Sequence, residues 1–278
     1  MATPALPAIM LVAELPLLRQ PVAAGARCPL QGAIARRMWQ ACAPLVQQAD
    51  GFITPMAAVA GAVAQELVAA YQRPGIHRAW VNNGGDIALH LAPGQQARVG
   101  LYADIARFAG DALQRTATGQ LRTDAGFLVR ADDAVRGVAT SGWRGRSQSR
   151  GIADSVTVLA ASAALADAAA TVIANAVDVA DAGVQRRPAC QVRDDSDLGA
   201  IPVTVAVPPL LPAVVAQALH AGLATARRLQ PRGRVQAVLL VCQGKMLRLP
   251  ARPGAGRAAG ATRAATAATG RAGSAIAA

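Results

Sequence analysis

Residues 155–177 decide the fold, and they read SVTVLAASAALADAAATVIANAV. Ser155 to Ala160 is rich in β-branched residues and predicts a strand, whereas Ser162 to Val177 predicts a helix. That helix is almost wholly Ala, Leu, Val and Ile. Its polar exceptions, Asp167, Thr171 and Asn175, recur at i, i+4 and i+8 and therefore line one face. The stretch is thus a strand followed directly by an apolar helix with one thin polar stripe.

Helical and β-rich segments surround this stretch on both sides. Thr54-Pro55 is typical of a helix start, with Thr as the N-cap and Pro at the first helical position. Paired β-rich runs predict hairpins at 76–91 and 235–249. Further helices are expected at 30–48, 54–73 and 211–229, further strands at 97–102, 127–130, 134–139 and 201–207, and one or two short strands with turns within 11–29. This mixture predicts an α+β (mixed α/β) fold.

Two parts of the chain share one order of elements. A helix that ends at Gly75 precedes a hairpin that closes at Leu91, and a helix that ends near Gly233 precedes a hairpin that closes at Leu249. Two pseudo-repeated halves within a single domain, residues 1–250, would explain this order. Independent use of a common helix-and-hairpin unit explains it equally well. Residues 251–278 are mainly Ala, Gly, Thr and Arg, so we expect a disordered tail.

Composition argues against several classes of protein. The net charge is +12, but ten of the positive charges lie from Arg227 onward, and no Asp or Glu follows Asp197. No aromatic residue follows Trp143, so the basic segment lacks stacking platforms and we do not expect nucleic-acid binding. No apolar run is long enough to span a membrane. Met1 to Pro21 lacks the basic start of a signal peptide, so we expect a cytoplasmic protein.

The turn of the first predicted hairpin is the first candidate site. It reads Asn82-Asn83-Gly84-Gly85-Asp86. Paired glycines let backbone N–H groups approach a ligand closely, and the Asn and Asp side chains can bond a phosphate, a ribose or the edge of a ring. A hairpin turn that uses Asn and Gly only for positive φ would have the same sequence.

Two further segments carry candidate residues. Thr140-Ser141-Gly142 begins a polar run with three arginines that extends to Gly151, and it suits either an anion-binding loop or a solvated one. On the apolar helix, Asp167 and Thr171 offer a carboxylate and a hydroxyl one turn apart, which are hard oxygen ligands of the kind Mg²⁺ accepts. The same stripe would suit a solvent-facing side of the helix. The histidines and cysteines form no recognisable nucleophile or metal motif, so the catalytic residues stay unknown.

Taken together, these segments resemble the ApbE family of FAD-dependent flavin transferases (FAD:protein FMN transferases). The similar pieces, in chain order, are Asn83-Gly84-Gly85-Asp86-Ile87, Thr140-Ser141-Gly142, Ser155-Val156-Thr157-Val158 and Ala166-Asp167-Ala168-Ala169-Ala170-Thr171. The span from Asp50 to Leu198 resembles more closely uncharacterised protein family 0280, a branch of the ApbE-like superfamily. The resemblance implies two intertwined helix-plus-antiparallel-sheet halves with a central cleft.

The resemblance also implies a ligand, a metal and a reaction. The segments Asn82 to Asp86 and Thr140 to Gly142 would lie against bound FAD, and Asp167 with Thr171 would bind Mg²⁺. The metal would neutralise the FAD diphosphate, and FMN would pass to a protein hydroxyl with AMP as the leaving group.

Two departures from the family keep alternatives open. Val59-Ala60-Gly61 stands where the family has Ala-Lys-Gly, and Arg150-Gly151-Ile152-Ala153-Asp154 stands where it has His-Ile-Ile-Asp-Pro. The sequence therefore predicts an Mg²⁺-dependent enzyme acting on FAD or a related diphosphate nucleotide, or a non-catalytic module that binds a flavin, pterin or nucleotide. A basic accessory protein for nucleic acids is a third alternative. The expected partner is a small molecule, and a homodimer is the commonest assembly.

Overall fold

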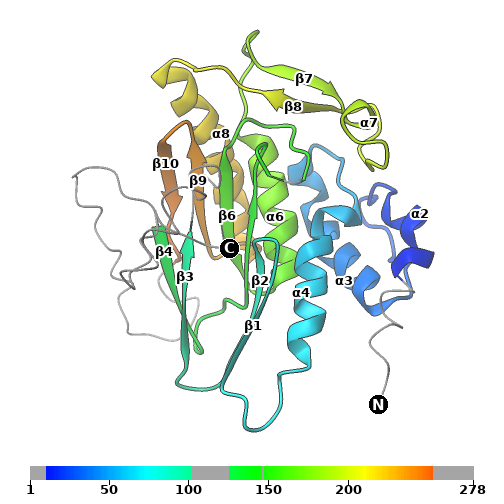
Figure 1. Ribbon diagram of the computed structural model, residues 1–278, viewed down its shortest axis with the longest axis vertical. Helices are drawn as coiled ribbons and strands as arrows, with labels where there is room; N and C mark the ends of the chain where they lie inside the picture. Colours follow the sequence, from blue (N-terminus) through cyan, green and yellow to red (C-terminus); the bar gives the residue numbers. More distant parts are fainter. Residues whose placement is uncertain (1–10, 102–124, 146, 253–278) are drawn as a thin grey trace, which may run out of the picture.

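A computed structural model describes residues 11–101, 125–145 and 147–252 of the chain (Figure 1). Helices and antiparallel strands are mixed along these residues, so the fold is α+β, as predicted. No described helix combines the length and the apolar character needed to cross a lipid bilayer. Residues 253–278 of the predicted tail lie outside the described range.

Four helices provide most of the helical part of the fold. They are α3 (Ala33–Cys42), α4 (Val59–Ala69), α6 (Ala163–Ala176) and α8 (Pro212–Leu229). Shorter helical elements accompany them: α2 (Leu15–Leu18), α7 (Ala189–Val192) and the 3₁₀ helices η1 (Ala43–Ala49), η2 (Pro55–Ala58) and η4 (Gln230–Arg232). The helix predicted at 30–48 is thus α3 continued by η1, and that at 54–73 is η2 continued by α4.

Six strands form one antiparallel sheet in the order β1-β2-β5-β6-β9-β10. They are β1 (Arg78–Asn83), β2 (Asp86–Leu91), β5 (Gly137–Ser141), β6 (Ser155–Ala160), β9 (Ala237–Cys242) and β10 (Lys245–Leu249). The two predicted hairpins, β1-β2 and β9-β10, occupy opposite edges of this sheet. The pseudo-repeat of the two halves stays a prediction.

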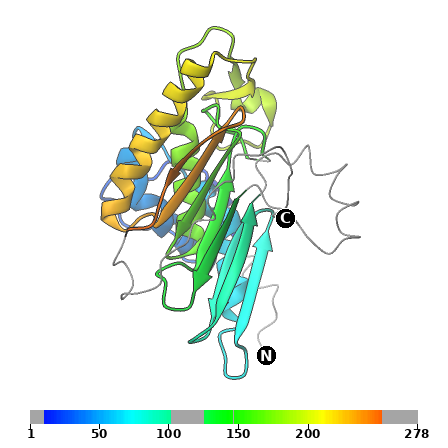
Figure 2. The same ribbon diagram turned by 90° about the vertical axis from the view of Figure 1, so that its left-hand side faces the viewer.

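Two ribbons lie outside the main sheet. One pairs β3 (Gln96–Leu101) with β4 (Ala125–Arg130), and the other pairs β7 (Gln185–Pro188) with β8 (Pro202–Ala206). Three of these strands were predicted and β7 was missed. Figure 2 shows the β7-β8 ribbon at one end of the molecule, beyond the main sheet.

The main sheet is covered on both faces. The large helices pack on one face, and the β3-β4 ribbon lies against the other (Figure 1). Because both faces are covered, every residue of β6 and β9 is buried. These two strands therefore read as nearly continuous apolar runs instead of alternating patterns.

Helix α6 lies at the centre of the helical layer and packs against β5, β6, α3, α4 and α8. Its neighbours approach its backbone closely, because glycines stand at the crossing points. A Cβ added at Gly61 would lie 2.3 Å from the carbonyl oxygen of Ala163, and one added at Gly137 would lie 2.2 Å from the nitrogen of the same residue. A Cβ at Gly151 would lie 2.1 Å from the carbonyl oxygen of Ala174. No side chain larger than hydrogen fits these crossings.

The prediction of short strands within 11–29 was wrong. This segment contains the helical turn α2, which has a proline, Pro16, in its first turn. The Glu14 carboxylate next to it accepts the backbone N–H groups of Gln31 (2.6 Å) and Gly32 (2.8 Å) at the start of α3. The segment is thus held by a carboxylate at a helix start and not by strand pairing.

Thr54 stands at the predicted N-cap position, but without a side-chain capping bond. Its hydroxyl donates instead to the carboxylate of Asp197. Pro55 does occupy the first turn, as expected, but that turn is the 3₁₀ helix η2.

We expect Gly137→Ala to lower the free energy of unfolding by about 3 kcal/mol, because overpacking against backbone that cannot move is costly. The added methyl group would meet backbone atoms of Ser162 and Ala163 at 2.2–2.4 Å. Urea denaturation measures the change. Ala69→Ser, at an exposed position of α4, is the control and should shift stability by less than about 0.5 kcal/mol. Wild-type stability in Gly137→Ala would contradict the close approach of β5 to α6.

Candidate functional site

The polar stripe of α6 is half-buried and contacts other parts of the protein. Asp167 lies at the N-terminal end of α4, where its carboxylate accepts the backbone N–H groups of Gly61 (2.9 Å) and Ala60. The first turn of a helix presents unpaired N–H groups and the positive end of the helix dipole, so a carboxylate is favoured there. Asn175, two turns along α6, accepts the backbone N–H of Arg150 at 2.9 Å. The stripe is therefore a contact face of α6 that is only partly open to solvent.

The predicted hairpin turn reaches the same region from the sheet. Asn83 and Asp86 pair with each other where β1 and β2 meet the turn. The Asn83 side-chain amide donates to the carbonyl oxygen of Ala60 (3.2 Å), and the buried Asp86 carboxylate accepts the N–H of Thr140 (3.2 Å). The structure thus brings together parts of all three predicted segments: the hairpin, β5 and α6.

Asp86 and Asp167 place two carboxylates in one enclosed region. Burial, followed by the negative charge of Asp86, raises the pKa of Asp167 well above its usual value, and the N–H groups of Gly61 and Ala60 offset only part of this rise. Ionised Asp167 therefore lacks a matching positive charge, and a proton or a bound cation would relieve the repulsion.

Thr171 lies one turn from Asp167 and lines a cavity of about 230 Å³. The cavity is bounded by α6, by residues 52–59 around η2, by the loop 147–150 and by residues 193–198. Its lining includes three arginines, Arg19, Arg150 and Arg193, but no lysine or histidine. Asp86 and Asp167 are not part of this lining; Thr171 connects the two regions.

Residues 195–197 form the rim of the cavity and join three separate parts of the chain. The pairs are Asp195 with Arg19 (an ion pair of 3.7 Å), Ser196 with Gln148, and Asp197 with Thr54. The sequence does not reveal these pairs, because the partners are distant along the chain: 143 residues separate Thr54 from Asp197.

Other predicted residues do not reach the carboxylate pair. Asn82 lies on the opposite face of β1, and Gly84 and Gly85 are the central residues of the hairpin turn, with φ values of 69° and 108°. The turn alone explains both glycines. Ser141 is buried at the end of β5, and a Cβ on Gly142 would lie 2.4 Å from a backbone oxygen of the segment that precedes β6. Ligand binding by these residues stays a prediction.

Cys42 also lies near this region, and the sequence did not single it out. Its thiol donates to the carbonyl oxygen of Thr54 at 3.3 Å. Burial, and then the charges of Asp167 and Asp197, raise the pKa of this thiol. A thiol that remains protonated is a poor nucleophile, so Cys42 is a packing residue here.

Comparison with protein families places this chain in a known group. Residues 8–248 match the model of the family described as AbpE bacteria. The chain belongs to this family. The match spans the hairpin, β5 and α6, so all the residues that meet around Asp167 lie within the family's region.

Archaeal proteins named UPF0280 protein are similar to the chain. The one from Methanospirillum hungatei JF-1 is 36% identical over 150 residues, which cover 54% of this chain and 53% of that protein. The one from Methanothermobacter thermautotrophicus Delta H is 39% identical over 130 residues, 46% of this chain and 44% of that protein. The chain spans about half the length of the curated relatives it matches. These relatives confirm the predicted similarity to uncharacterised protein family 0280.

We expect Asp167→Asn to stabilise the protein at neutral pH. Because folding raises the pKa of Asp167, the folded protein holds this proton more tightly than the unfolded chain does. Stability therefore falls as pH rises from 3.8, the ordinary Asp value, through the raised value. An asparagine Oδ1 can still accept the Gly61 N–H without carrying charge.

Thermal unfolding in EDTA, from about pH 4, near the ordinary Asp pKa, to about pH 8, measures this effect. The gain in thermal stability of Asp167→Asn over the wild type should grow with pH and vanish near pH 4, about the ordinary pKa of Asp. The exposed Asp132→Asn is the control and should show no such trend. A stability difference that does not change with pH would mean that Asp167 ionises without penalty.

Proposed function

We propose that this protein binds FAD or a related diphosphate nucleotide together with Mg²⁺ and cleaves the diphosphate bond. The observation that carries the proposal is the half-buried polar stripe of α6. On it, Asp167 lies beside a second carboxylate, and Thr171 lies on the wall of an arginine-lined cavity one turn away. A bound cation would reduce the repulsion between the two carboxylates, and a bound anion would pair with the positive charge of the arginines.

The donor set fits Mg²⁺. The carboxylates of Asp86 and Asp167 and the hydroxyl of Thr171 are hard oxygen donors, and Mg²⁺ is usually held by one or two carboxylates together with water and substrate phosphates. Within the described ranges no group of three or more His, Cys, Asp or Glu side chains is arranged to hold a metal. In this proposal Asp167 and Thr171 hold the ion. When bound, Mg²⁺ would neutralise the diphosphate and polarise it for attack.

The arginines of the cavity would bind phosphate oxygens. Guanidinium groups do so through pairs of parallel N–H donors. The volume of about 230 Å³ is below the roughly 300–1,000 Å³ typical of pockets that enclose a whole drug-sized ligand. The cavity therefore suits the phosphate and ribose part of the nucleotide, with its rings extending beyond the rim. An attacking hydroxyl or water would take the FMN phosphoryl group, and AMP would leave.

A second candidate is a module that binds the same ligand without cleaving it. Its support is the lack of a histidine or lysine in the cavity lining, since such side chains commonly transfer protons. Ala60, whose N–H contacts Asp167, also stands where the ApbE-like enzymes that the sequence resembles have lysine.

Incubation with FAD and Mg²⁺, followed by separation of bound flavin and released AMP, tests the proposal. Wild-type protein should release AMP, and EDTA should stop the release. Asp167→Asn and Thr171→Val should each lower the rate by about 100-fold, because each removes a proposed metal ligand. Asp132→Asn should keep the wild-type rate.

The possible outcomes separate the candidates. Flavin binding by the wild type without AMP release would select the non-catalytic module. No flavin binding at all would refute both candidates, and full Mg²⁺-dependent release by Asp167→Asn would refute the metal ligand. Unfolding does not confuse the result, because Asp167→Asn is expected to be at least as stable as the wild type at neutral pH.

A further inference from the structure

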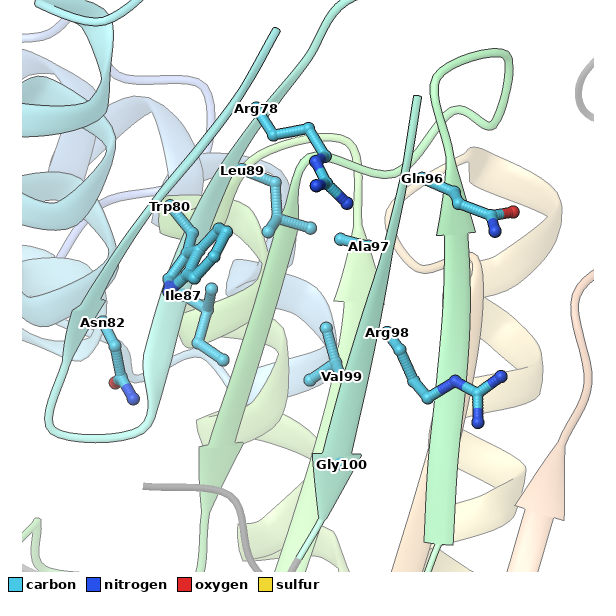
Figure 3. Close-up of a pocket in the computed structure, with 10 residues that line it drawn as sticks. All are labelled: Arg78, Trp80, Asn82, Ile87, Leu89, Gln96, Ala97, Arg98, Val99 and Gly100. Atoms are coloured by element: carbon cyan, nitrogen blue, oxygen red, sulfur yellow. The ribbon is translucent and has the colours of Figure 1, made fainter. Parts of the chain in front are cut away.

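A second cavity lies on the other face of the sheet, between β2 and β3 (Figure 3). Its volume is about 330 Å³. Ile87 and Leu89 of β2 form its floor, and Ala97 and Val99 of β3 point toward it from the far side (Figure 3). These four side chains make an apolar slot.

Arg78 and Trp80 form the near wall of this slot. They lie two residues apart in β1 and therefore share one face of the strand, and Figure 3 shows both side chains extending over β2 toward the cavity. Trp80 is 64% exposed, so its ring is open to a ligand. The Arg78 guanidinium makes no hydrogen bond or ion pair with any residue of the described ranges. None of the described residues that line the cavity is acidic.

We propose that this cavity binds a planar aromatic or heteroaromatic carboxylate. Its ring would stack on the indole of Trp80, because aromatic rings prefer offset stacking. The apolar side chains of Ile87 and Leu89 would contact the ring from the floor of the slot. Its carboxylate would bind the guanidinium of Arg78, whose parallel N–H donors match two carboxylate oxygens. The volume falls within the range of small-molecule sites, about 300–1,000 Å³.

This site is separate from the region around Asp167. Along β1 and β2 successive side chains alternate between the two faces of the sheet. Trp80 and Ile87 face the slot, whereas Asn83 and Asp86 contact α4 and β5 on or near the helical side. Binding in the slot therefore requires neither Mg²⁺ nor the proposed function.

Calorimetric titration with 2-naphthoate and with its neutral counterpart 2-naphthamide tests the proposal. Wild-type protein should bind the acid about tenfold more tightly than the amide, since a charged hydrogen-bonded pair outweighs a neutral one. Arg78→Gln should remove this preference. Trp80→Ala should lower the affinity for both compounds about tenfold. Trp80→Phe keeps an aromatic ring and should retain most of the wild-type affinity.

Two matched controls use residues near each site. Arg73→Gln should keep the preference for the acid, because Arg73 is exposed and is not among the residues that line the cavity. Asp167→Asn should bind both compounds as the wild type does. Equal affinity of the wild type for the two compounds, an acid preference that survives Arg78→Gln, or failure of both compounds to bind would each overturn the proposal.

Discussion

Helix α6 can lie at the centre of this protein only because its neighbours have no side chain where they cross it. Four glycines stand at these crossings, Gly61, Gly137, Gly151 and Gly222, and each would place a Cβ 2.1–2.3 Å from α6 or from Val177, which follows it. Alanines bury little area each, so such a helix is stabilised by close backbone approach and dense packing. The direction of its polar stripe is fixed by the same contacts.

The close approach of α4 to α6 also creates the electrostatic character of the site. Where Gly61 meets α6, the carboxylate of Asp167 is hydrogen-bonded to peptide N–H groups at the start of α4. The β1-β2 hairpin adds Asp86 to this region, and the charge of Asp86 raises the pKa of Asp167 further. Like charges held together by a rigid fold are typical of sites that act on charged ligands.

One hairpin contributes to two different environments. The end of β1 and the start of β2 supply Asn83 and Asp86 to the region around Asp167, while Arg78 and Trp80 of β1 form the wall of the slot on the other face. The two-residue period of a strand separates these chemistries without any extra element. Sequence reasoning found the polar turn because Asn-Gly pairs are distinctive, but it passed over Trp80, whose exposure depends on how β3 packs nearby.

The local pattern of apolar and polar residues in the sequence determines several elements of this protein. The strand at 155–160, the helix after it and both hairpins follow from the periods of strand and helix, and the common face of Asp167 and Thr171 follows from their spacing. Tertiary structure alone decided that this face is half-buried against the start of α4, that Asp86 lies beside it, and that Thr54 bonds Asp197 across 143 residues and not its own helix. Periodicity records which residues share a face, whereas burial and charge coupling depend on partners that are remote along the chain.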